Sequence, residues 1–246
     1  MQMSMLMALA LALAVAPARA ADLQVIAGGG IAVPLNEIAA QFEQTSGHKV
    51  VIRYGTAPEL IEIARTTPFD LAVTPSEVFQ DESAAEQLVP GRTTDIARVG
   101  LGVAVRTGAP KPDIGTSDAL KQALLTARTV GTIPASAAGA QVMKLFDRLG
   151  VAKEVKAKLQ AAANPTKLLE VMTSGQAELG IFITNVLTAN GLDMVGPVPA
   201  ELDYVLTYTS GIARRAAQAQ IARAFLDYLR SPQATAVLKA RGLMPG

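Results

Sequence analysis

Short segments with strand character alternate with segments of helical periodicity along almost the whole chain. The expected strands are residues 23–27, 49–55, 69–74, 97–107, 128–133, 178–183, 193–198 and 204–213. The expected helices are residues 32–47, 58–66, 75–88, 117–127, 138–150, 165–175, 216–230 and 232–241. Repeated strand–helix units require a mostly parallel sheet with helices on both of its faces. The sequence therefore predicts an α/β fold.

Two of the expected strands, 97–107 and 204–213, are long and carry glycine near the middle or the end. Both separate blocks of strand–helix units, so we expect them to cross between two lobes and to form the hinge. Each lobe would contain a mostly parallel sheet flanked by helices, and ligands favour the cleft between lobes. The predicted lobes are residues 21–101 together with 209–246 for lobe 1, and residues 102–208 for lobe 2.

The first twenty residues have the pattern of a cleavable secretory signal peptide. An apolar run from Leu6 to Ala16 is followed by Ala18, Arg19 and Ala20, which match a small-residue cleavage site. The run is short for a membrane span. We therefore expect residues 1–20 to be removed and the remainder to be secreted.

Charge and composition exclude several classes of protein. Lys and Arg total 22 and Asp and Glu total 21, so loss of Arg19 with the signal peptide leaves equal numbers, without the basic stripe that nucleic acids need. The chain has no Cys and one His, His48, which excludes Cys nucleophiles and His-rich metal sites. We expect no metal, no cofactor, no nucleic-acid partner and a monomeric protein.

Four junctions place small residues between a strand, or a loop, and the N-terminus of a helix. They read "VIAGGGIAVPL", "VIRYGTAPEL", "GTIPASAAGAQV" and "AANPTKLLEVM". Free N–H groups and the helix dipole favour negative charge at such ends. The glycines lack the spacing of a P-loop or of a dinucleotide fingerprint, so we predict a pocket for a small anion. Its predicted residues are Gly29, Gly30, Arg53, Thr56, Ala57, Ser136, Ala138, Gly139, Pro165, Thr184 and Asn185.

Several of these residues also have a purely structural interpretation. Thr56 and Glu59 fit a capping box, in which Thr56 can both cap its helix and contact a ligand. Glu59 is expected to be its partner rather than a base. Arg53 can meet a ligand carboxylate or lie exposed on its strand, and Asp70 is expected to be structural.

The order and spacing of these segments resemble periplasmic molybdate-type solute-binding proteins over nearly the whole chain. The resemblance implies the type II periplasmic binding fold, in which two α/β lobes close over a ligand. That family has Ser where Gly30 and Ala57 stand, and Tyr where Ile183 stands, so Ile183 joins the predicted site. Because these three side-chain donors are missing, we expect backbone N–H groups and room at Gly30 for a ligand larger than molybdate.

The stretch "GRTTDIARVGLGVAVRTGAPKPDI" resembles a branch of that family that includes aconitate isomerase. The resemblance thus implies two functions. The favoured one is capture of a small anion, an organic carboxylate or an oxyanion, for the membrane subunits of an ABC transporter. The alternative is a cofactor-free isomerase of a small unsaturated carboxylic acid, which needs a base near the substrate. Glu59 is the candidate base, and enzymatic activity stays open.

Overall fold

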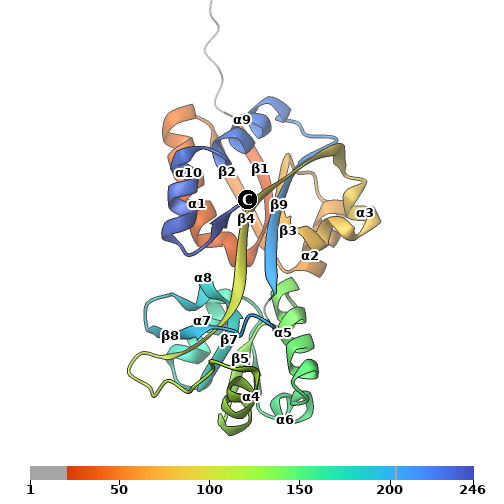
Figure 1. The fold of residues 1–246 in the computed structure, drawn as a ribbon. Coiled ribbons are helices and arrows are strands. Elements are labelled where there is room, and N and C mark those ends of the chain that lie inside the picture. The colour runs from red at the N-terminus through yellow and green to blue at the C-terminus, as the bar shows by residue number, and fades with distance from the viewer. Residues whose placement is uncertain (1–20, 203) are drawn as a thin grey trace, which may run out of the picture.

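The computed structural model describes residues 21–202 and 204–246, which form two lobes connected by extended strands (Figure 1). The predicted signal peptide, residues 1–20, lies outside the described residues. Within the described ranges, none of the helices has the length and apolar character needed to cross a membrane.

The strands combine into mixed sheets, which are continuous through β4. Their bounds are β1 Asp22–Gly28, β2 Lys49–Gly55, β3 Leu71–Pro75, β4 Leu88–Arg106, β5 Val130–Thr132, β6 Leu159–Ala161, β7 Leu179–Ile183, β8 Leu192–Pro197, β9 Val205–Ala213 and β10 Met244–Pro245. In the first lobe the order is β2-β1-β3-β9-β4, and in the second β4 is followed by β7, β5 and β6. The pairs β1–β2, β1–β3, β5–β6 and β5–β7 are parallel.

Helices cover the sheets of both lobes (Figure 1). Their bounds are η1 Gly29–Ile31, α1 Ala32–Ser46, α2 Ala57–Thr66, η2 Ser76–Gln80, α3 Glu82–Ala85, α4 Ser117–Thr126, α5 Ala137–Arg148, α6 Ala152–Lys156, α7 Pro165–Thr173, α8 Thr184–Leu187, α9 Ala219–Leu229 and α10 Pro232–Ala240, where η marks a 3₁₀ turn. The α/β fold predicted from the alternating pattern is confirmed.

The long strand β4 runs through both lobes (Figure 1). Residues up to Gly100 pair with β9, whereas residues 101–106 pair with β7 and β8. Strand β9 returns the chain to the first lobe and pairs there with β3 and β4 from Val205 onward. The expected division at residue 209 therefore falls inside β9, and we propose that the lobes divide just before Val205.

Several elements differ from the sequence-based expectation. Residues 75–88 form a 3₁₀ turn and a four-residue helix rather than one longer helix. Asp81 interrupts the segment, because its carboxylate accepts a hydrogen bond from Ala84 N at 3.1 Å and caps the second piece. The strand β6 was not expected, since its three residues carry no alternation of their own and pair only because β5 lies beside them.

The predicted apolar stripes form the core. Leu35, Ile38 and Phe42 of α1 are almost fully buried, and the Phe42 ring lies 5.0 Å from that of Phe225 in α9. Asp70 is also buried, and its two carboxylate oxygens accept the N–H groups of Gln24 and Gln218, both at 2.8 Å. The expectation that Asp70 is structural is confirmed, because it joins β1 to the start of α9.

Candidate ligand-binding cleft

A cavity of about 850 Å³ lies between the lobes, and residues of both line it. The N-terminal ends of α1, α2, α5 and α7 all reach it. They contribute Gly29 and Gly30, Thr56, Ser136 and Pro165 respectively. The four junctions singled out from the sequence thus meet at one place, although the first and the last of them are more than a hundred residues apart in the chain.

Three of the four helix ends carry side-chain caps of their own. At α5, Ser136 Oγ accepts a hydrogen bond from Gly139 N at 3.0 Å, and at α7, Asn164 Oδ1 accepts one from Lys167 N at 3.0 Å. At α2, the Glu59 carboxylate fills this role. The start of α1, reached through the turn Gly29–Ile31, has no side-chain cap. No side chain therefore competes with a bound anion for the backbone N–H groups there, although that of Ala32 donates to Gly29 O.

Glu59 completes the predicted capping box and lines the cavity. Its Oε2 atom accepts hydrogen bonds from Thr56 N at 2.7 Å and from Thr56 Oγ1 at 2.9 Å. The backbone N–H of Thr56, and then its hydroxyl, hold the pKa of Glu59 below its ordinary value. Glu59 is consequently a stable carboxylate that occupies donors an anion would otherwise use, and it is a weak proton acceptor.

Gly30 lines the large cavity, but the direction in which a side chain would point from it is filled. A Cβ atom added at Gly30 would lie 2.5 Å from Ile183 Cδ1 and would also collide with the Tyr208 hydroxyl. Both side chains are almost fully buried, and burial raises the pKa of Tyr208, so this group stays protonated. The place of the family's Ser side chain is thus filled by Ile183 of β7 and Tyr208 of β9.

A second cavity, of about 30 Å³, is lined by Ile183 and Tyr208 and shares Gly29, Gly30 and Thr56 with the first. Three predicted site residues, Ala57, Ala138 and Ile183, line this smaller cavity rather than the larger one. A volume of this size holds only a water molecule or two. The part of the cleft next to Gly30, Ala57 and Ile183 is therefore narrow.

Three further predicted residues, Arg53, Gly139 and Thr184, line neither of these two cavities. The Arg53 guanidinium lies exposed on β2 and donates to Thr67 Oγ1 at 3.5 Å. Gly139 lies inside the first turn of α5 as the partner of Ser136. Thr184 begins the short helix α8, and its neighbour Asn185 lines the cavity instead.

Asn185 connects the two lobes. Its Nδ2 atom donates to the backbone oxygen of Gly30 at 2.7 Å, across 155 residues of sequence. Its Oδ1 atom is buried and has no hydrogen-bond partner within the described part of the chain. Asn185 therefore contacts the facing lobe and also lines the cavity.

Sequence reasoning missed several polar residues that line the cavity, among them Arg241 and Tyr54. Arg241, the residue after α10, lines the cavity and donates from Nε and Nη2 to Glu37 Oε2 at 3.1 and 2.6 Å. The Tyr54 hydroxyl donates to Asn36 Oδ1 at 2.8 Å, and burial raises its pKa. No spacing in the sequence relates Arg241 to a helix more than 200 residues earlier. The described residues contain no cluster of three or more side chains suited to a metal ion.

Comparisons with known proteins agree with this architecture. Residues 23–244 match the family model described as bacterial extracellular solute-binding protein. The chain is 32% identical to the aconitate isomerase of Pseudomonas sp over 232 residues, which cover 91% of this chain and 87% of the relative. It is 26% identical to the molybdate-binding protein ModA of Azotobacter vinelandii, with 92% and 90% covered.

A solved structure from the same group of proteins has a similar fold. The periplasmic molybdate-binding protein of Azotobacter vinelandii superposes with a TM-score of 0.75 and 20% identity, covering 90% of this chain and 98% of the other. The resemblance expected from the order of the segments is thereby confirmed, including the relationship to aconitate isomerase. The chain belongs to the bacterial extracellular solute-binding protein family, in its molybdate-type group.

Proposed function

We propose that this protein captures a small organic carboxylate between its lobes, in the periplasm, and delivers it to the membrane subunits of an ABC transporter. The observation that carries the proposal is the convergence of four helix N-termini on one cavity of about 850 Å³. Helix N-termini stabilise negative charge without charged side chains. The family of the chain and its predicted signal peptide support the location.

The size and the walls of the cavity favour a ligand with a carbon skeleton. Its volume lies in the ordinary range for pockets that hold small organic molecules. Apolar side chains such as Val33, Leu169 and Phe182 line it together with the polar groups. A compact oxyanion would leave much of this surface without contact.

The neighbourhood of Gly30 argues against molybdate. The family's Ser at this position and its Tyr at position 183 are absent, and Ile183 with Tyr208 fills the remaining space. In addition, Glu59 already accepts hydrogen bonds from Thr56 at the N-terminus of α2. These donors are therefore not free to complete a ring of hydrogen bonds around a compact oxyanion.

A thermal-shift panel tests the proposal. The purified protein is melted with molybdate, tungstate, sulfate and a series of monocarboxylates, dicarboxylates and tricarboxylates. A ligand at about 100 times its Kd stabilises the folded state by about 2.7 kcal/mol. We expect the melting temperature to rise with at least one carboxylate and to stay unchanged with the oxyanions. A large rise with molybdate would contradict the proposal.

An isomerase acting on a small unsaturated acid is the second candidate, because the Pseudomonas aconitate isomerase is 32% identical to this chain. The carboxylate of Glu59 lines the cavity, but its lowered pKa makes it a weak base. Incubation with cis-aconitate, followed by separation of the isomers, tests this candidate. Steady conversion that is lost in Glu59→Gln would favour the isomerase, and binding without conversion would favour the transport protein.

A further inference from the structure

Arg241 is the one positively charged side chain among the described residues that line the large cavity. It does not belong to the four helices whose N-termini reach the cavity, because it follows the C-terminal end of α10. The cavity therefore has two separate places for negative charge, one at the helix N-termini and one at this guanidinium.

The contacts of Arg241 hold its side chain in place without using up its hydrogen-bonding capacity. Two N–H groups donate to the same oxygen of Glu37, whereas a guanidinium has five N–H donors in total. Both side chains are substantially exposed, at 49% for Arg241 and 38% for Glu37. An ion pair in contact with water is only weakly stabilising, so a ligand carboxylate can share this guanidinium or take it over.

Arg241 also lies where the two lobes meet. A Cβ atom on the next residue, Gly242, would lie 3.9 Å from the Cα atom of Asn185 in α8 of the other lobe. Asn185 itself donates to Gly30 O at the start of α1. A carboxylate bound to Arg241 would therefore be partly enclosed by both lobes, where charge-assisted hydrogen bonds are stronger than in water.

We propose that Arg241 binds a second carboxylate group of the ligand, which is thus a dicarboxylate or a tricarboxylate. This inference rests on the function proposed above. One carboxylate lies at the helix N-termini, next to the uncapped start of α1. The second lies at Arg241, after the C-terminal end of α10. Arg241 then selects ligands by the number of their carboxylates, and the ligand competes with Glu37 for the guanidinium.

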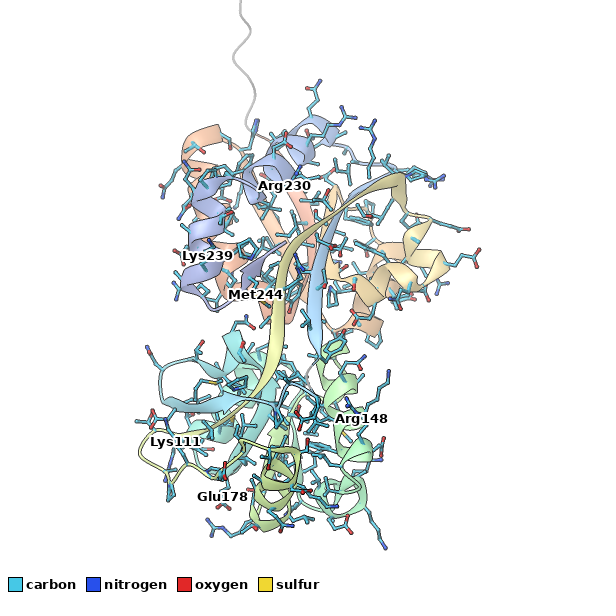
Figure 2. The ribbon with its side chains drawn as sticks, in the orientation of Figure 1. Lys111, Arg148, Glu178, Arg230, Lys239 and Met244 are labelled. Carbon is cyan, nitrogen blue, oxygen red and sulfur yellow. The ribbon has the colours of Figure 1, made fainter. Side chains whose placement is uncertain are left out.

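Calorimetric titration of the wild type and of Arg241→Gln tests this role. Succinate and butyrate serve as probes with equal numbers of carbon atoms, and tricarballylate adds a third carboxylate. We expect Arg241→Gln to weaken the binding of succinate and tricarballylate by about tenfold or more, and to leave butyrate within about twofold. Lys239→Gln is the matched control, because it removes the same charge from an exposed residue in α10, two positions before Arg241, that does not line the cavity (Figure 2).

Each outcome separates the inference from the proposed function. If no carboxylate binds the wild type, the proposed function fails. If carboxylates bind but Arg241→Gln behaves like Lys239→Gln, or weakens butyrate as much as succinate, the role of Arg241 is refuted and the proposed function stands. If the wild type does not bind butyrate, the binding of succinate and tricarballylate decides the role of Arg241. Weaker binding by Arg241→Gln than by Lys239→Gln supports that role, and equal binding refutes it.

A second variant keeps the inference testable if Arg241→Gln does not fold. Glu37→Gln leaves the cation in place and removes the carboxylate that competes for it. We expect this variant to bind succinate and tricarballylate at least as tightly as the wild type does, and weaker binding of both would overturn the inference.

Discussion

Replacing Gly30 by Ala tests whether Ile183 and Tyr208 fill the space into which a side chain at position 30 would point. The new methyl group would lie 2.5 Å from Ile183 Cδ1 and would also meet the Tyr208 hydroxyl. Carbon atoms in ordinary contact are about 3.5–4.0 Å apart, so the Ile183 methyl group must move by about 1 Å or more. Ile183 and Tyr208 are 1% exposed, which leaves them little freedom to move.

The expected cost follows from two opposing effects. Overpacking a buried site costs about 1–3 kcal/mol. Replacing Gly by Ala stabilises by about 0.4–1 kcal/mol through the unfolded state. The net loss is about 1–2 kcal/mol, which corresponds to a decrease of about 2–8 °C in the melting temperature for a chain of this size. Urea unfolding with an unchanged m-value measures this loss directly.

Gly29→Ala is the matched control. Gly29 also lines the cavity, but a Cβ atom there would lie 3.4 Å from the nearest atom, Pro165 Cδ. We expect this variant to be as stable as the wild type or slightly more stable. Ile183→Val removes the methyl group that collides, so it should cost less in the Gly30→Ala background than alone. Equal stabilities of Gly30→Ala and Gly29→Ala would refute the reasoning.

Three further predictions concern the buried Asp70 and two residues that line the cleft, Asn185 and Glu59. Asp70→Ala should lower the free energy of unfolding in urea by about 3 kcal/mol, because it leaves the buried N–H groups of Gln24 and Gln218 without an acceptor; an effect below about 1 kcal/mol would contradict this. Asn185→Ala should weaken carboxylate binding by about threefold to tenfold in calorimetric titration, since it removes the hydrogen bond that joins the lobes, and unchanged affinity would argue against that role. Because the folded state lowers the pKa of Glu59 from 4.5, its capping contribution is present above that pH and is lost as the pH falls through the lowered value. The difference in melting temperature between the wild type and Glu59→Gln should therefore shrink in acid, and a difference that grows below pH 4.5 would disprove this account.

Local signals predicted most of the fold. The limits of helix α1 could be predicted because its apolar residues recur at helical spacing and a glycine follows its last turn. That glycine, Gly47, ends the helix with a φ of 72°, which glycine adopts easily. The four junctions were likewise visible, since small residues next to a helix start are a local pattern. The short strand β6 was not, because its three residues form a strand only beside β5.

The finer features of the cleft depend on contacts between distant segments. Gly30, Ile183 and Tyr208 meet only when β1, β7 and β9 are assembled, so the expected space at Gly30 could not be checked in the sequence. In the same way, Arg241 reaches the cavity only because α10 packs against α1. Arg53 looked better placed, since it belongs to a strand that ends at the cleft, but its side chain lies on the exposed surface.

Calorimetric titration of the purified wild-type protein with carboxylates and with molybdate tests the central claim most directly. The account predicts saturable binding of one carboxylate molecule per chain, and that an excess of molybdate does not displace it. It predicts no heat of binding for molybdate alone, because Ile183 and Tyr208 fill the space beside Gly30. Saturable binding of molybdate, together with no binding of any carboxylate, would contradict the account.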